Sequence, residues 1–330
     1  MGDLRAIATR MVGGGRGILA ADESTATMSG RLEKVGVAGS EEHRRAYREM
    51  LITTPDLSKW ISGVILSDDI LRAQLTDGRP FPAACLDAGV LAGIKVDTGA
   101  KPLAHAPGES VTEGLDGLRE RLATYVQMGA SFTKWRAVIR IGDSTPSQRA
   151  LAANAHALAR YAALAQEAGL VPIVEPEVLM DGDHALERCE DAAAAILRAV
   201  FGELVEQGVS LEGMVLKPNM VTAGKDNPRQ AAIEEVASAT IRVLRRCVPA
   251  AVPGIAFLSG GQPPELATAH LAALVAHGPH PWELTFSFGR ALVDPALRAW
   301  RGDERNVASG QEALAARCRA NAEARALIPA

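Results

Sequence analysis

Eight short apolar runs alternate with longer segments of helical character along almost the whole chain, and this alternation constrains the fold most. The runs are rich in Val, Ile and Leu, as strands buried on both faces are. They cover residues 18–21, 61–66, 91–96, 131–139, 170–178, 213–217, 254–258 and 283–287. We therefore expect a parallel sheet whose strands are linked by helices.

The segments between the runs are rich in Ala, Leu, Glu and Arg at helical spacing, most clearly at 147–167, 187–207, 230–246, 265–277 and 311–327. Gly169 and Gly208 follow two of them and suit the left-handed residue that ends many helices. Strand–helix units that recur about every 40 residues predict an α/β fold, the (β/α)8 TIM barrel. A doubly wound sheet competes, but no GxGxxG follows the first strand. No linker divides the chain, so we expect a single domain over residues 1–330.

Composition excludes several classes of protein. A content of 48% hydrophobic and 22% charged residues is that of a globular chain, and a net charge of −4 disfavours a nucleic-acid partner. No apolar stretch approaches the ~18 residues that span a membrane, and the first residues lack the apolar core of a signal peptide. We expect a cytoplasmic protein with no membrane partner. The four cysteines are far apart and form no CxxC pair, so no metal site is predicted.

Charged residues interrupt the apolar runs near their carboxyl ends: Asp22, Lys95, Asp97, Lys134, Arg136, Glu175, Glu177 and Lys217. Six of the eight form pairs spaced two residues apart, which places both members of a pair on one face of a strand. In a barrel that face is the interior. Exposed rim residues or structural ion pairs are the alternative for any single member. Because barrel enzymes hold their active sites at this end, the whole set predicts an active site.

Lys217 is the only charged residue of its apolar run. A lysine in a desolvated site near other cations loses its proton more readily, and the neutral amine attacks ketones to form a Schiff base. We expect Lys134 and Arg136 to supply the neighbouring positive charge. Loss of water from the first adduct needs an acid/base group, and either Glu175 or Glu177 is placed to provide it.

Two glycine-containing sequences follow the seventh and eighth predicted strands. The first is Ser259-Gly260-Gly261, and the second runs from Ser287 through Gly289 to Arg290. Barrels frequently bind phosphate at these two loops through backbone N–H groups that glycine leaves accessible. A plain turn is the alternative for either one alone, but together they predict a phosphate site.

Seven motifs carry a resemblance to a known family: GILAADES at 17–24, GIKVD at 93–97, KWR at 134–136, VEPE at 174–177, LKPNMV at 216–221, FLSGGQ at 257–262 and TFSFGRA at 285–291. In this order, from about residue 12 to about residue 325, the chain resembles the class I, Schiff-base-forming fructose-1,6-bisphosphate aldolases. The resemblance implies reversible cleavage of fructose 1,6-bisphosphate to dihydroxyacetone phosphate and glyceraldehyde 3-phosphate.

The resemblance also implies a catalytic role for each matched residue. Lys217 matches the Schiff-base lysine, Glu175 the acid/base for dehydration of the carbinolamine, and Glu177 its neighbouring carboxylate. Asp22 matches the group that takes the C4 hydroxyl proton, with Lys134 as its cationic partner.

The remaining matches concern substrate binding. Arg136 matches a residue that positions the substrate. The phosphate next to the imine carbon is expected at Ser259, Gly260, Gly261, Ser287, Gly289 and Arg290. The other phosphate is expected at Ser24, Thr27, Arg31 and Lys95.

The chain departs from the family pattern in two ways. Gly30 stands where the family often has a lysine and Thr27 where it often has a serine, which implies a weaker hold on the second phosphate. Well-studied members end in a tyrosine that assists protonation of the enamine. Here the sequence ends in Ile328-Pro329-Ala330, and the tyrosines are Tyr47, Tyr125 and Tyr161. The expectation is slower protonation of the enamine.

The resemblance further implies a metal-independent glycolytic lyase with no cofactor, a phosphorylated sugar as substrate, and a homo-oligomer, usually a tetramer. Two alternatives stay open at this point. One is another Schiff-base barrel, such as a transaldolase. The other is a protein that keeps the fold as a binding scaffold without the activity.

Overall fold

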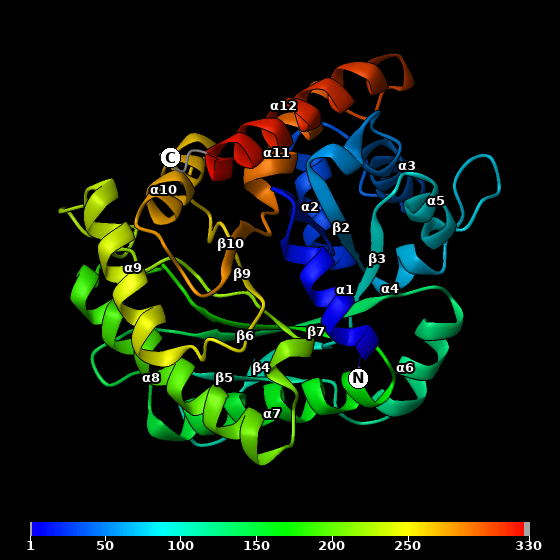
Figure 1. Cartoon of the computed structure of the whole chain (residues 1–330). Helices are drawn as coiled ribbons and strands as arrows, with labels where there is room; N and C mark the ends of the chain where they lie inside the picture. Colours follow the sequence, from blue (N-terminus) through cyan, green and yellow to red (C-terminus); the bar gives the residue numbers. More distant parts are fainter. Residues whose placement is uncertain (1, 327–330) are drawn as a thin grey trace.

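In the computed structural model, which describes residues 2–326, eight parallel strands form a nearly closed barrel surrounded by helices (Figure 1). The strands follow one another around the barrel in chain order: β1 (Gly17–Ala21), β2 (Ile61–Leu66), β3 (Leu91–Lys95), β6 (Phe132–Ile139), β7 (Val171–Val178), β8 (Val215–Leu216), β9 (Gly254–Phe257) and β10 (Glu283–Phe286). The predicted TIM barrel is confirmed, and each predicted strand is present with ends that differ by at most two residues.

The helices are α1 (Gly2–Val12), α2 (Thr25–Lys34), α3 (Glu41–Ile52), α4 (Asp68–Leu71), α5 (Phe81–Asp87), α6 (Leu118–Gln127), α7 (Gln148–Glu167), α8 (Leu186–Glu206), α9 (Ile233–Cys247), α10 (Pro264–Ala276), α11 (Arg290–Trp300) and α12 (Val307–Ala326). Gly169 and Gly208 have φ of 79° and 69° just after α7 and α8, as predicted. No helix among residues 2–326 is long and apolar enough to cross a membrane.

Helix α1 precedes the first strand and packs against the amino-terminal end of the barrel. Its buried Ala8, Met11 and Val12 join the interior strand residues Phe132 and Val171 in one apolar cluster. This end of the barrel is therefore filled by hydrophobic side chains, which leaves the carboxyl ends of the strands for a site.

Strand β6 shows how each strand separates two environments. The Trp135 ring stacks on Tyr161 of α7, with ring centroids 5.5 Å apart, whereas Lys134, Arg136 and Val138 line a cavity inside the barrel. Alternate side chains of the strand therefore face the outer core and the inner cavity, as the two-residue spacing in the sequence predicted.

The first and last strands meet at a seam. The N–H of Ala20 donates to the carbonyl oxygen of Phe288, just beyond β10, at 3.1 Å. Near the other end of β1, the Phe286 ring fills the space beside Gly17, where a Cβ atom would overlap it. Closure of the barrel therefore depends on a glycine at this position.

Some short elements were not predicted from the sequence. A hairpin of β4 (Gly99–Pro102) and β5 (Ser110–Glu113) is inserted between β3 and β6, and its first strand contributes Gly99 and Ala100 to the cavity wall. Residues 327–330 lie outside the described residues. These include the last residue of the predicted helix 311–327 and the end of the chain on which the expectation about the tyrosine rests.

Candidate functional site

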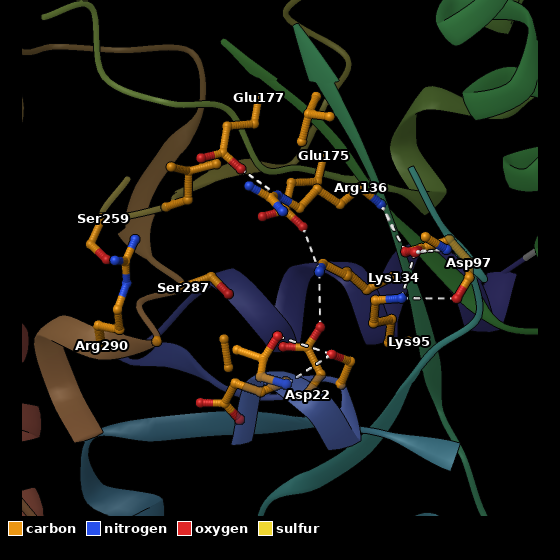
Figure 2. Close-up of a pocket in the computed structure, with 18 of the residues that line it drawn as sticks. Asp22, Lys95, Asp97, Lys134, Arg136, Glu175, Glu177, Ser259, Ser287 and Arg290 are labelled. Carbon is orange, nitrogen blue, oxygen red and sulfur yellow. Dashed lines mark hydrogen bonds and ion pairs between the residues drawn. The ribbon is translucent and has the colours of Figure 1, made fainter. Parts of the chain in front are cut away.

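A cavity of about 730 Å³ opens at the carboxyl ends of the strands. Every predicted site residue lines it except Gly261, which lies beside the Arg290 guanidinium at its edge. Figure 2 shows charged side chains converging on this space from the ends of β1, β3, β6 and β7 and from the start of α11, together with Ser259 and Ser287 from the loops after β9 and β10.

Four side chains of alternating charge form a row across the floor of the cavity. The Lys134 Nζ donates to the Asp22 Oδ2 at 2.8 Å and lies 2.9 Å from the Glu175 Oε2. The other carboxylate oxygen of Glu175, Oε1, lies 3.2 Å from the Lys217 Nζ. All four side chains are nearly buried. Such charges are tolerated in an interior because each has an oppositely charged partner.

The register of the strands places these residues side by side. Arg136 is paired with Glu175 across β6 and β7, and Lys95 with Lys134 across β3 and β6. Lys217 follows the last residue of β8, and its N–H donates to the carbonyl oxygen of Val174 at 2.8 Å. The backbone of Lys217 is therefore held as firmly as a strand residue.

Burial and the row of charges act in opposite directions on the carboxyl groups. Burial by itself would raise the pKa of Asp22, but the charges of Lys134 and Lys217 outweigh it and lower that pKa to about 2. The same balance between burial and the charges of Lys134, Lys217 and Arg136 lowers the pKa of Glu175. Burial would lower the pKa of Lys134, yet Asp22 and Glu175 raise it above its usual range. At neutral pH both carboxylates and this lysine are ionised.

The expected cationic field around Lys217 is largely offset. Lys134 lies between two carboxylates, and the Arg136 Nε donates to the Glu177 carboxylate. The nearest counter-charge to Lys217 is the Glu175 carboxylate, which the sequence suggested only as a proton carrier.

Asp97 organises the wall next to this row. Its carboxylate lies 2.5 Å from the Lys95 Nζ and accepts hydrogen bonds from the backbone N–H of Gly99 at 3.1 Å and of Arg136 at 3.2 Å. Asp97 therefore ties β3, β4 and β6 together. It belongs to the predicted set of strand-end charges, although no role in binding was assigned to it.

The two glycine-containing loops lie together, as their places after β9 and β10 require. Gly260 and Gly261 have φ of 60° and 94°, and a Cβ on Gly261 would lie 2.9 Å from the Arg290 Nη2. Arg290 is the first residue of α11. The Ser287 hydroxyl is buried and has no hydrogen-bond partner within residues 4–326. This corner thus offers a hydroxyl, a guanidinium and backbone groups to an anion.

A buried histidine supports the same loop, and sequence reasoning missed it. The His270 Nδ1 of α10 lies 2.6 Å from the Gln262 Oε1, directly after the two glycines. Burial lowers the pKa of His270 to about 4, so its ring is neutral at pH 7. No motif marks this residue, because a buried histidine on a helix resembles any other core position.

The opposite wall is formed by α2. Ser24 caps this helix, its Oγ lies 2.9 Å from the Thr27 Oγ1, and both residues line the cavity. Arg31 also lines it, but its guanidinium binds the carboxylates of Glu23 and Asp294. Lys34, which the sequence pattern did not single out, lines the cavity at the end of the same helix.

No group of three or more His, Cys, Asp or Glu side chains that could hold a metal ion occurs in the described part of the chain.

Comparisons with known proteins agree on one family. The sequence pattern of the class-I fructose-bisphosphate aldolases matches residues 3–327. A probable class 1 fructose-bisphosphate aldolase from Xanthomonas campestris is 54% identical over 315 residues, which are 95% of this chain and 94% of that protein. Fructose-bisphosphate aldolase B from Gallus gallus is 51% identical over 317 residues, 96% of this chain and 87% of the relative.

A solved structure resembles the whole chain. It is that of fructose-bisphosphate aldolase from Plasmodium falciparum in complex with TRAP and a small molecule inhibitor. The two superpose with a TM-score of 0.97 at 43% identity, and the match covers 100% of this chain and 96% of that one.

Proposed function

The chain belongs to the class I fructose-bisphosphate aldolases, and on that premise we propose which of its own residues carry out the family's reaction. That reaction is the reversible aldol cleavage of fructose 1,6-bisphosphate to dihydroxyacetone phosphate and glyceraldehyde 3-phosphate through a lysine Schiff base. The observation that carries the assignment is the buried row of Asp22, Lys134, Glu175 and Lys217.

Lys217 is the nucleophile that attacks the C2 carbonyl of the substrate. The Glu175 carboxylate, 3.2 Å away, accepts a proton from the Lys217 ammonium and frees its lone pair. Attack gives a carbinolamine. Glu175 then returns the proton to the carbinolamine hydroxyl, which leaves as water while the protonated imine forms. Lys134 binds the other oxygen of Glu175 and keeps the carboxylate oriented.

Asp22 is the base for cleavage of the C3–C4 bond. With a pKa of about 2 it is ionised at neutral pH and can accept the C4 hydroxyl proton. The electrons of the breaking bond flow to the iminium nitrogen, and glyceraldehyde 3-phosphate leaves. Protonation of the resulting enamine at C3 and hydrolysis of the imine release dihydroxyacetone phosphate. Lys134 stabilises the ionised form of Asp22 before the proton moves.

The remaining predicted residues orient the substrate. Arg136 and Glu177 form an ion pair beside the row and position the sugar hydroxyl groups. The phosphate next to the imine carbon binds at the corner of Ser259, Gly260, Gly261, Ser287, Gly289 and Arg290. The other phosphate binds at the α2 side, near Ser24, Thr27, Arg31 and Lys95.

Reduction of the imine tests the assignment of the nucleophile. Borohydride added with dihydroxyacetone phosphate should convert the imine to a stable secondary amine, and peptide mapping should place the label on Lys217. The variant Lys217→Met should take no label. Lys59→Met removes an exposed lysine that precedes β2 at the other end of the barrel and should be labelled as the wild type is. A label on any other lysine, or none in the wild type, would rule out this nucleophile.

We propose in addition that residues 1–330 act as one domain, because the single barrel draws its strands from Gly17 to Phe286. A relative from Arabidopsis thaliana is named cytosolic, which supports a cytoplasmic location for this chain. The family resemblance supports a homo-oligomer, with a tetramer as the expected assembly. Light scattering on the purified protein would distinguish a tetramer from a monomer.

A further inference from the structure

The positive and negative charges of the side chains that line the cavity do not cancel. Seven are basic and five are acidic, an excess of two positive charges. Five of the basic side chains form ion pairs with carboxylates: Arg31, Lys95, Lys134, Arg136 and Lys217. Lys34 and Arg290 form neither ion pairs nor side-chain hydrogen bonds with the other side chains of residues 4–326. These two are the cations left to neutralise a ligand.

The two unpaired cations belong to different parts of the wall. Arg290 begins α11 next to the loop of Gly261, in the corner assigned to the phosphate nearest the imine. Lys34 ends α2, whose cap Ser24 and first turn form the other wall. A sugar with a phosphate at each end would therefore meet one unpaired cation at each end.

The geometry of α2 directs Lys34 towards that second phosphate. Ser24, Thr27, Gly30 and Lys34 are three, three and four residues apart and all line the cavity, so they share one face of the helix. Side chains of a helix lean back towards its amino terminus. The space beside Gly30, one turn before Lys34, is open, because no atom lies within 4 Å of where a Cβ would be. The lysine stem can therefore lie over Gly30 with its ammonium towards Ser24 and Thr27.

The other cations of this wall already have partners. Arg31 lies between Glu23 and Asp294, and Glu23 also binds the buried Arg48 at 3.2 Å. Lys95 lies 2.5 Å from the Asp97 carboxylate. Each would have to share or give up a carboxylate in order to bind a phosphate, whereas Lys34 would lose only water.

We propose that Lys34 is the cation that binds the phosphate remote from the imine, and that it sets the preference for fructose 1,6-bisphosphate over fructose 1-phosphate. This inference rests on the proposed function of the site and adds to it a residue that determines specificity. Lys34 lies one helical turn after Gly30, on the same face of α2.

The test compares the two substrates on one variant. Lys34→Met should raise KM for fructose 1,6-bisphosphate about tenfold, the loss of roughly one charge-assisted hydrogen bond, with little change in kcat. Kinetic constants for fructose 1-phosphate should stay at the wild-type values, because that substrate lacks the remote phosphate. The control Lys59→Met removes the same charge outside the cavity and should change neither substrate. Equal effects on both substrates, or none on either, would overturn the proposal.

Relocation of the ammonium separates binding from a structural effect. Lys34 also lies in the last turn of α2, where a basic side chain stabilises the helix dipole. If its role is to bind phosphate, the double variant Gly30→Lys with Lys34→Met should recover most of the preference for the bisphosphate, since both positions share one face. If its role is only structural, the double variant should keep the kinetics of Lys34→Met, and the proposal fails.

A separate readout shows whether the underlying assignment fails instead. Dihydroxyacetone phosphate carries only the phosphate near the imine, so borohydride should trap it on Lys217 equally well in the wild type and in Lys34→Met. No trapping in the wild type contradicts the proposed nucleophile. Normal trapping in both proteins with an unchanged substrate preference contradicts the role of Lys34 alone.

Discussion

Each ionised group on the cavity floor depends on its neighbours of opposite charge. Asp22, Lys134, Glu175 and Lys217 follow one another with alternating sign at 2.8 to 3.2 Å. Removal of one member leaves a buried charge without its partner, which costs about 3–5 kcal/mol in comparable pairs. Substitutions in this row will therefore change stability as well as chemistry, and the two effects have to be measured separately.

Asp22 should make the protein more sensitive to acid. Its pKa falls from 3.8 to about 2 on folding, so its contribution to stability is complete above pH 3.8 and is lost as the pH falls through about 2. The contribution is about 2 kcal/mol. In Asp22→Asn the free energy of unfolding, measured by urea denaturation at a series of pH values, should fall less steeply over this window. Parallel curves would contradict the shift.

The charged residues inside the barrel were predictable because a charge in an apolar strand is rare and strand spacing fixes its face. Lys34 was not, because it is an exposed residue at the end of a short helix, where a lysine is ordinary. The role proposed for Lys34 could be inferred only from the structure, which shows the ion pairs of the other cavity cations. Which of Glu175 and Glu177 lies next to Lys217 was likewise settled by the fold, which brings Glu175 to 3.2 Å.

At the scale of secondary structure, the eight strands and the long helices after β6 were predictable because each repeats its pattern over enough residues. The helices α1 to α6 and α11 and the hairpin β4–β5 were not identified. These helices have 4 to 12 residues, so each holds only a few turns of the apolar pattern, and the two hairpin strands are mostly exposed or half-buried and form no apolar run. Of these elements, α2, β4 and α11 contribute residues to the cavity wall, so the site was predicted less completely than the barrel.

The loop between β9 and α10 depends on Gly261. An alanine there would adopt a φ near 94° at a cost of about 1–2 kcal/mol, and its Cβ would press on the Arg290 guanidinium. Gly261→Ala should therefore raise KM for both fructose 1,6-bisphosphate and fructose 1-phosphate several-fold, unlike Lys34→Met. Gly208→Ala has a φ of 69° and open space around the Cβ at the end of α8, so it should lose stability but keep KM. Equal KM values in both variants would show that the loop tolerates a side chain.

At the scale of the whole molecule, closure of the barrel is the event that assembles the site. Asp22 follows the first strand, whereas Ser287 and Arg290 follow the last. The hydrogen bond from Ala20 to Phe288 joins these two parts of the chain across the seam.

Gly17 should limit how well the seam closes. Gly17→Ala would place a methyl group in the Phe286 ring and should lower the free energy of unfolding by about 1–3 kcal/mol, the usual cost of overpacking. Gly202→Ala is its matched control, since this glycine of α8 has open space around it and alanine favours a helix by about 0.5–1 kcal/mol. The urea midpoints of the two variants should therefore shift in opposite directions from that of the wild type. A stabilised Gly17→Ala would mean that the ring can move aside.

The seam also has a consequence for the order of events on the ribosome. Asp22 is among the first residues made, yet the corner that binds the phosphate beside the imine is incomplete until Arg290 has left the exit tunnel. Once Lys217 has been made, the nascent chain carries every charged cavity residue except Arg290, yet the site is still incomplete. Sugar phosphates in the cell can therefore stabilise only the finished barrel.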